Sequence, residues 1–161
     1  MKRQGQRARN VVFLVLVFTF AILVLALWFG RSIGLPFPVF AALAIVFGLL
    51  GLALTVLTVR LHETRKRKTL FILTGVSAAG IPACAILHNL VYGLLIELFG
   101  KGFWGPDGDE PVFLILAVLV CPALFVIGAG ASGILLLKER ITGNKAEPQQ
   151  GAPPDADKPA R

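Results

Sequence analysis

The side chains that could do chemistry in this chain are concentrated in residues 69–99, within one long apolar stretch. They combine hydroxyl, thiol, imidazole, amide and phenol groups: Thr74, Ser77, Cys84, His88, Asn89 and Tyr92. A polar group in an apolar membrane segment is costly unless it is paired or used, so a functional site is first sought here. At about 100° per residue, these side chains share one face of a helix, with Asn89 at its edge.

His88 is the most versatile member of this group, because an imidazole can move a proton or ligate a metal ion or haem iron. The second histidine, His62, lies too far along the chain to join it. Cys84 and Cys121 form no C-x-x-C pair. We therefore predict no cofactor, and an interhelical hydrogen bond as the role of His88. A proton site, a metal ligand and a haem ligand are the alternatives, and any missing half of a site is expected from another chain.

The elements that must position these residues follow from composition. Of 161 residues, 56% are hydrophobic and only 16% are charged, which is too apolar for a water-soluble domain of this size. Four long apolar stretches cover residues 11–29, 37–59, 69–97 and 111–137, and each can cross a hydrocarbon core of about 30 Å. The sequence predicts an all-α membrane protein with four transmembrane helices in an antiparallel bundle.

Lysine and arginine predict the orientation of this bundle. Twelve of the sixteen fall in the N-terminal flank, the middle loop and the flank after residue 137, which are on the same side of a four-helix bundle. The positive-inside rule places this side, with both termini, in the cytoplasm of a multi-pass cell-membrane protein, as in a bacterial or archaeal inner membrane. The net charge of +7 is thus a topology signal and not a nucleic-acid footprint. The most compact basic run is expected to contact lipid headgroups: Arg65, Lys66, Arg67 and Lys68.

Two further boundaries follow from the ends of the chain. The apolar stretch 11–29 is longer than a signal-peptide core and ends in bulky residues, so it is predicted to remain as an anchor. Residues 1–141 form the transmembrane domain. Residues 142–161 contain several prolines and no aromatic residue, which predicts a disordered cytoplasmic tail.

Small residues predict where the helices pack. They recur at helical spacing in the second and fourth stretches and let another backbone approach closely: Ala41, Ala44, Gly48, Gly51, Gly128 and Ser132. The first stretch has bulky residues on all faces and is expected to be the most lipid-exposed. Pro111 suits the first turn of the fourth helix, which Asp109 or Glu110 would cap.

Function is less determined than topology. The chain contains no Walker loop, H-E-x-x-H, G-x-S-x-G or Rossmann motif. We predict a non-enzymatic accessory or assembly subunit of a membrane complex, or a homo-oligomer, with the bilayer and another membrane protein or a second copy as partners. The alternatives are a transporter or channel with a polar path along the third helix, and a haem-binding or redox subunit that uses His88.

Overall fold

The computed structural model describes residues 2–30, 32, 34–105, 108 and 110–145, and all regular structure in these ranges is helical. The helices are α1 (Lys2–Phe29), α2 (Phe37–Arg60), α3 (Arg65–Phe99), α4 (Pro111–Ile115), a π-helical turn η1 (Leu116–Val120) and α5 (Cys121–Lys145). Because α4, η1 and α5 are continuous, the described residues contain four apolar spans, packed as a bundle. The predicted fold class is confirmed.

The helices extend beyond the apolar stretches that predicted them. α1 begins at Lys2 and α3 at Arg65, several residues before the hydrocarbon-length segments, because polar residues continue the helix into water. Prolines mark two helix starts, as Pro at the first turn lacks only a donor that would be unpaired anyway. Gly100 ends α3 with φ +87°, a conformation that favours glycine. α5 continues to Lys145, while residues 146–161 of the predicted tail lie outside the described residues.

The π-helical turn in the fourth span has a local cause. Pro122 has no backbone N–H and cannot donate to the carbonyl of Val118, so the α-helical pattern cannot continue there. Immediately before it, the Cys121 N–H donates to the carbonyl of Leu116, five residues back. Such a bulge shifts the helical register by one residue and sets which side chains of the fourth span face α3.

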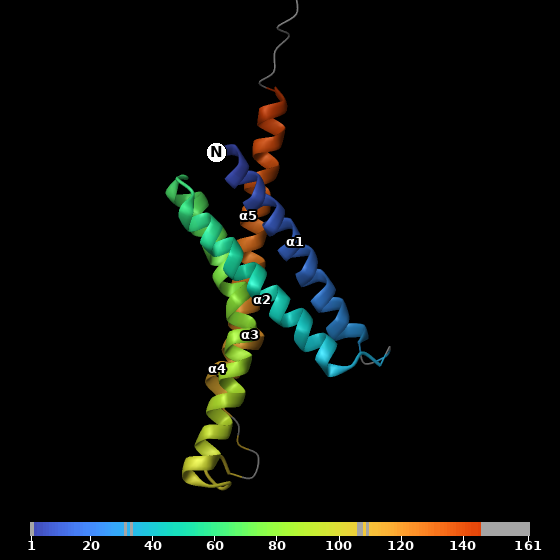
Figure 1. Cartoon of the computed structure of the whole chain (residues 1–161), viewed down its shortest axis with the longest axis vertical. Coiled ribbons are helices and arrows are strands. Elements are labelled where there is room, and N and C mark those ends of the chain that lie inside the picture. The colour runs from blue at the N-terminus through green and yellow to red at the C-terminus, as the bar shows by residue number, and fades with distance from the viewer. Residues whose placement is uncertain (1, 31, 33, 106–107, 109, 146–161) are drawn as a thin grey trace, which may run out of the picture.

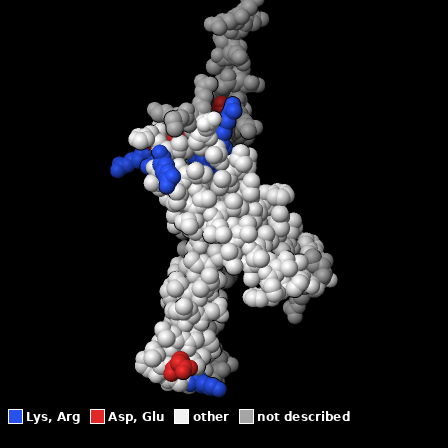
Figure 2. Space-filling view, viewed as in Figure 1, with Lys and Arg blue, Asp and Glu red and all other residues white. Residues whose placement is uncertain are grey.

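The four spans form two helical hairpins that cross (Figure 1). α1 pairs with α2, α3 pairs with the fourth span, and α2 packs on α3. One end, here called the basic end, contains the turn between α2 and α3 and the charged parts of α1 and α5. Figure 2 shows Lys and Arg gathered there, above a long uncharged surface. The other, called the tryptophan end, contains Trp28 and residues 100–105. Towards this end the two hairpins diverge.

Aromatic rings fill the crossing point of the hairpins. Phe125 of α5 lies 4.5 Å from Phe20 of α1 and 5.3 Å from Phe47 of α2, measured between ring centroids. Phe13 of α1 meets Phe71 of α3 edge to face at 5.3 Å. Such pairs add about 0.5–1.5 kcal/mol each to area burial. The core therefore holds α1 against both α3 and α5.

The first span was predicted to be the most lipid-exposed, and its shares of buried and exposed residues lie close to those of the fourth span. α1 buries an inward stripe of Phe13, Leu16, Thr19 and Leu23. Bulky residues on every side of this helix concealed the stripe, since its members resemble their lipid-facing neighbours in hydrophobicity.

Candidate functional site

The polar face of α3 is largely used for packing. Thr74 and Ser77 are buried, and their hydroxyls donate to carbonyls one turn back in α3, those of Leu70 and Leu73. Gly128 of α5 lies directly against Thr74: a Cβ at that glycine would stand 2.8 Å from the threonine Oγ1. This half of the face is therefore a contact surface with the fourth span, and its hydroxyls are satisfied within their own helix.

The two cysteines meet across the same surface. Both are free and partly buried, and Cys84 lies close to the thiol of Cys121. Gly80 makes room for this contact, because a Cβ there would lie 2.9 Å from the Cys121 Sγ. Their proximity joins α3 to the start of α5 at mid-span.

Near the tryptophan end, His88 packs against the start of the fourth span. Its Nδ1 lies 3.0 Å from the backbone carbonyl oxygen of Glu110 and 3.3 Å from the Glu110 Oε2. Since a carbonyl only accepts hydrogen bonds, Nδ1 carries the proton in this contact. Glu110 is buried and caps α4, accepting from the N–H groups of Val112 and Phe113 at 2.8 and 2.9 Å. The predicted cap is confirmed for Glu110, whereas Asp109 lies outside the described residues.

The contact corrects one expectation. The sequence suggested that no carboxylate of the same chain reaches His88, yet Glu110 does so. Glu110 was assigned only a capping role because it sits beside Pro111. In fact its carboxylate serves the helix terminus and the histidine together. Tyr92 completes the cluster, with its ring stacked 6.5 Å from His88 and 6.0 Å from Trp104.

Removing this carboxylate should loosen the tryptophan end. We expect Glu110→Ala to lower the free energy of unfolding by about 1–2 kcal/mol, because a lost N-cap alone costs about that much. The matched control is Glu97→Ala, whose exposed side chain is at the same end and should change stability by less than about 0.5 kcal/mol. SDS titration followed by circular dichroism measures both. Equal effects would contradict a structural role for Glu110.

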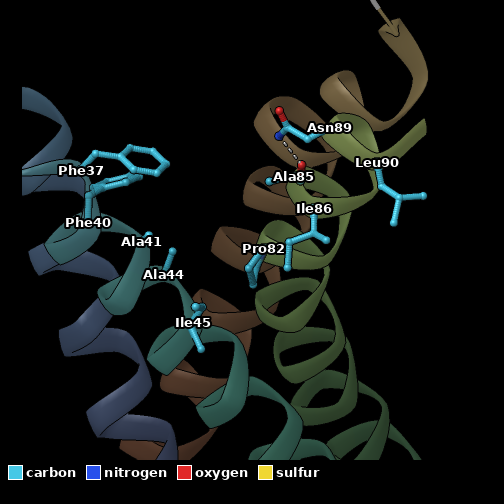
Figure 3. A pocket seen from close by; sticks show the side chains of 10 residues that line it. All are labelled: Phe37, Phe40, Ala41, Ala44, Ile45, Pro82, Ala85, Ile86, Asn89 and Leu90. Atoms are coloured by element: carbon cyan, nitrogen blue, oxygen red, sulfur yellow. Dashed lines mark hydrogen bonds between the residues drawn. The ribbon is translucent and has the colours of Figure 1, made fainter. Parts of the chain in front are cut away.

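Asn89 does not share the surroundings of the other polar residues. It is exposed, and its Nδ2 donates to the carbonyl of Ala85 at 2.8 Å, which is the side chain's one hydrogen bond among the described residues. It opens into a groove of about 670 Å³ between α2 and α3 (Figure 3). The other lining residues are apolar: Phe37, Phe40, Ala41, Ala44, Ile45, Pro82, Ala85, Ile86 and Leu90.

The groove begins where the close contact between α2 and α3 ends. A Cβ on Gly51 would stand 2.6 Å from the Gly75 carbonyl oxygen, and one on Gly48 would stand 2.6 Å from Pro82 Cγ. Beyond Pro82 the helices separate, so Ala44 and Ala41 face the groove instead of α3. The predicted stripe of small residues on α2 is thus divided into a contact half and an open half.

A second groove, on the other side of α2, provides a comparison. It measures about 660 Å³ and lies between α1 and α2 near the tryptophan end. Every lining residue is apolar: Ile22, Leu25, Ala26, Phe29, Leu35, Val39, Ala42, Leu43 and Val46. The two grooves have similar volumes and are lined by the same part of α2. Asn89 adds a polar amide to the groove between α2 and α3, and the other groove has no such side chain.

Ser132, the remaining residue of the predicted seams, is fully buried in α5. Its Oγ has no hydrogen-bond partner within the described ranges. Gly128, one turn earlier, is also buried and faces α3.

The predicted headgroup-binding run is divided as well. Arg65 and Lys66 are exposed. Arg67 instead reaches Glu139 of α5, with Nη1 2.7 Å from its Oε1, and Lys68 donates to the carbonyl of Val59 at 3.0 Å. Two of the four cations are therefore engaged within the protein.

An ionic network at the basic end was not anticipated from the sequence. Arg9 of α1 forms an ion pair with Glu63 of the turn between α2 and α3, and both side chains are buried, at 0% and 5% exposure. Glu63 also lies 3.3 Å from the Nε of Arg67 and accepts from Gln6 at 3.2 Å. The Arg9 guanidinium stacks over Phe71 at 4.1 Å. These contacts connect α1, α3 and, through Glu139, α5.

Within the described residues, no three His, Cys, Asp or Glu side chains come together as metal ligands would. The sequence matches no protein-family model, and neither a curated protein nor a solved structure is significantly similar to it.

Proposed function

We propose that this four-span membrane protein is a non-enzymatic accessory or assembly subunit that holds another transmembrane helix in the groove between α2 and α3. The observation that carries the proposal is the divergence of these helices beyond Gly48 and Pro82. It leaves an apolar surface inside the bilayer, about 13 Å long at 1.5 Å per residue, with small residues on one wall. Helices associate in lipid through close packing on small residues and through interhelical hydrogen bonds, and this groove offers both.

The proposed orientation places the basic end in the cytoplasm. Arg60, Arg65, Lys66 and Lys138 are exposed there, and Trp28 and Trp104 lie at the opposite boundary, where aromatic residues favour the headgroup region. The groove then opens in the outer half of the membrane.

Photo-crosslinking from the wall of the groove tests this proposal. A small diazirine amino acid at Ala44 should give protein adducts in native membranes, since Ala44 faces the groove. The matched control is the same substitution at Ala42, two residues away at similar depth, which faces the groove between α1 and α2. We expect mainly lipid adducts from Ala42. Only lipid adducts from both positions would overturn the proposal.

A further inference from the structure

The amide of Asn89 lies at a depth where an unpaired polar group is costly. The apolar part of α3 is centred close to Pro82, which places Asn89 about 10 Å from the midplane at about 1.5 Å per residue. Half of a hydrocarbon core is about 15 Å. Asn89 is nevertheless exposed on the groove side of α3. An exposed amide inside the hydrocarbon layer indicates that something polar covers it.

The hydrogen bond to Ala85 determines which hydrogen-bonding groups of the Asn89 amide still lack a partner. A primary amide has two N–H donors and one carbonyl acceptor, and one donor is used by the Ala85 carbonyl. One N–H and the Oδ1 have no partner among the described residues. This remaining set is self-complementary, because a second amide in the same state supplies the matching acceptor and donor.

We propose that the groove is filled by a second copy of this chain, with the two Asn89 amides paired reciprocally about a two-fold axis along the membrane normal. The inference rests on the proposed function and names its partner. In a two-fold interface the same surface is used by both copies, so α3 of each lies in the groove of the other. Ile86 and Leu90 flank Asn89 and are 60% and 56% exposed. In the dimer, these two side chains of one copy fill the space beside Ala41 and Ala44 of the other copy.

A lipid acyl chain in this groove would leave the Asn89 amide unpaired, because the chain has neither a hydrogen-bond donor nor an acceptor. The groove between α1 and α2 has nearly the same volume and no polar side chain in its lining, so lipid acyl chains suit it. The arrangement in Figure 1 favours the same choice. The half of the α3 hairpin near the tryptophan end stands apart from α1 and α2, so a second copy can approach α3 there without moving the core.

Self-association of the purified protein in liposomes tests the inference. Energy transfer between donor- and acceptor-labelled copies, measured while the protein is diluted in lipid, gives the dimer affinity. We expect a wild-type dimer that Asn89→Leu weakens roughly tenfold, as two interhelical hydrogen bonds of ordinary strength are lost. Ala44→Leu should weaken it by roughly tenfold or more by filling the groove. Ala42→Leu, in the other groove, should leave the affinity within about twofold of wild type.

The outcomes separate this inference from the proposed function. A wild-type protein that stays monomeric at every lipid ratio overturns the inference, as does a dimer that Asn89→Leu and Ala44→Leu leave unchanged. If the liposomes contain monomers while Ala44 crosslinks to a different protein in native membranes, the proposed function stands and the second copy is wrong. Unfolding in SDS, expected to be similar for Asn89→Leu and wild type, distinguishes lost association from lost fold.

Discussion

Glu63→Gln is expected to lower the free energy of unfolding by about 3–5 kcal/mol, because it leaves the buried Arg9 charge without its counter-ion. Arg9 has no solvent-exposed side-chain surface, and Glu63 is its one carboxylate partner among the described residues. The ring of Phe71 and the amide oxygen of Asn10, which accepts from Arg9 at 2.8 Å, cannot replace a negative charge. SDS titration with far-ultraviolet circular dichroism measures the loss.

Two companion variants establish the cause. Glu139→Gln removes a carboxylate that is 52% exposed and contacts the same Arg67, so it should cost less than about 1 kcal/mol. The double variant Arg9→Met with Glu63→Gln removes both charges of the buried pair and should recover part of the loss. If Glu63→Gln and Glu139→Gln are equally mild, or if the double variant is the least stable, burial of the ion pair is not what holds α1 in place.

The four helices could be predicted from the sequence, whereas this ionic network could not, and the reason is physical. Hydropathy reports each segment's preference for lipid, which is a local property, so four spans could be predicted from four apolar stretches. An ion pair between α1 and a turn more than fifty residues later depends on how the helices cross. Arg9 was counted as a positive-inside residue, and the same charge is equally compatible with solvent, a lipid headgroup or a buried carboxylate. Glu63, in a short charged loop, resembled a solvated residue.

The candidate site shows the same division. Periodicity predicts that Asn89 lies at the edge of the polar face of α3. The surroundings of Asn89 depend on whether α2 stays in contact with α3 at this level or diverges from it. The spacing of Ala41, Ala44, Gly48 and Gly51 is uniform along the helix, so it does not indicate that contact ends near Pro82. Likewise, the pairing of His88 with Glu110 depends on where the fourth span begins against α3. These features arise from helix crossing and depth, which a single sequence specifies only through the whole packed core.

The crossing itself can be tested at Gly75, where the backbones of α2 and α3 approach each other closely. A Cβ at this position would stand 2.6 Å from the Gly51 carbonyl oxygen and 3.1 Å from the Thr55 backbone nitrogen. Backbone atoms cannot rotate away as a flexible side chain can, so the helices must separate. We expect Gly75→Ala to cost about 1–3 kcal/mol, the usual range for overpacking. The substitution Gly75→Leu should prevent the two hairpins from packing.

Gly93→Ala is the matched control, because it adds the same methyl group to the same helix with no atom within 4 Å of the new Cβ. Relief of glycine's backbone entropy should make this variant neutral or up to about 1 kcal/mol more stable. The difference between the two alanine variants therefore isolates the cost of forcing the helices apart from that of changing helix propensity. If both variants had the same stability, the close approach of Gly51 and Gly75 would not fix the crossing, and the groove beyond Pro82 would lose its structural cause. If they differ as expected, the opening that exposes Asn89 follows from a contact made about four turns away along α3.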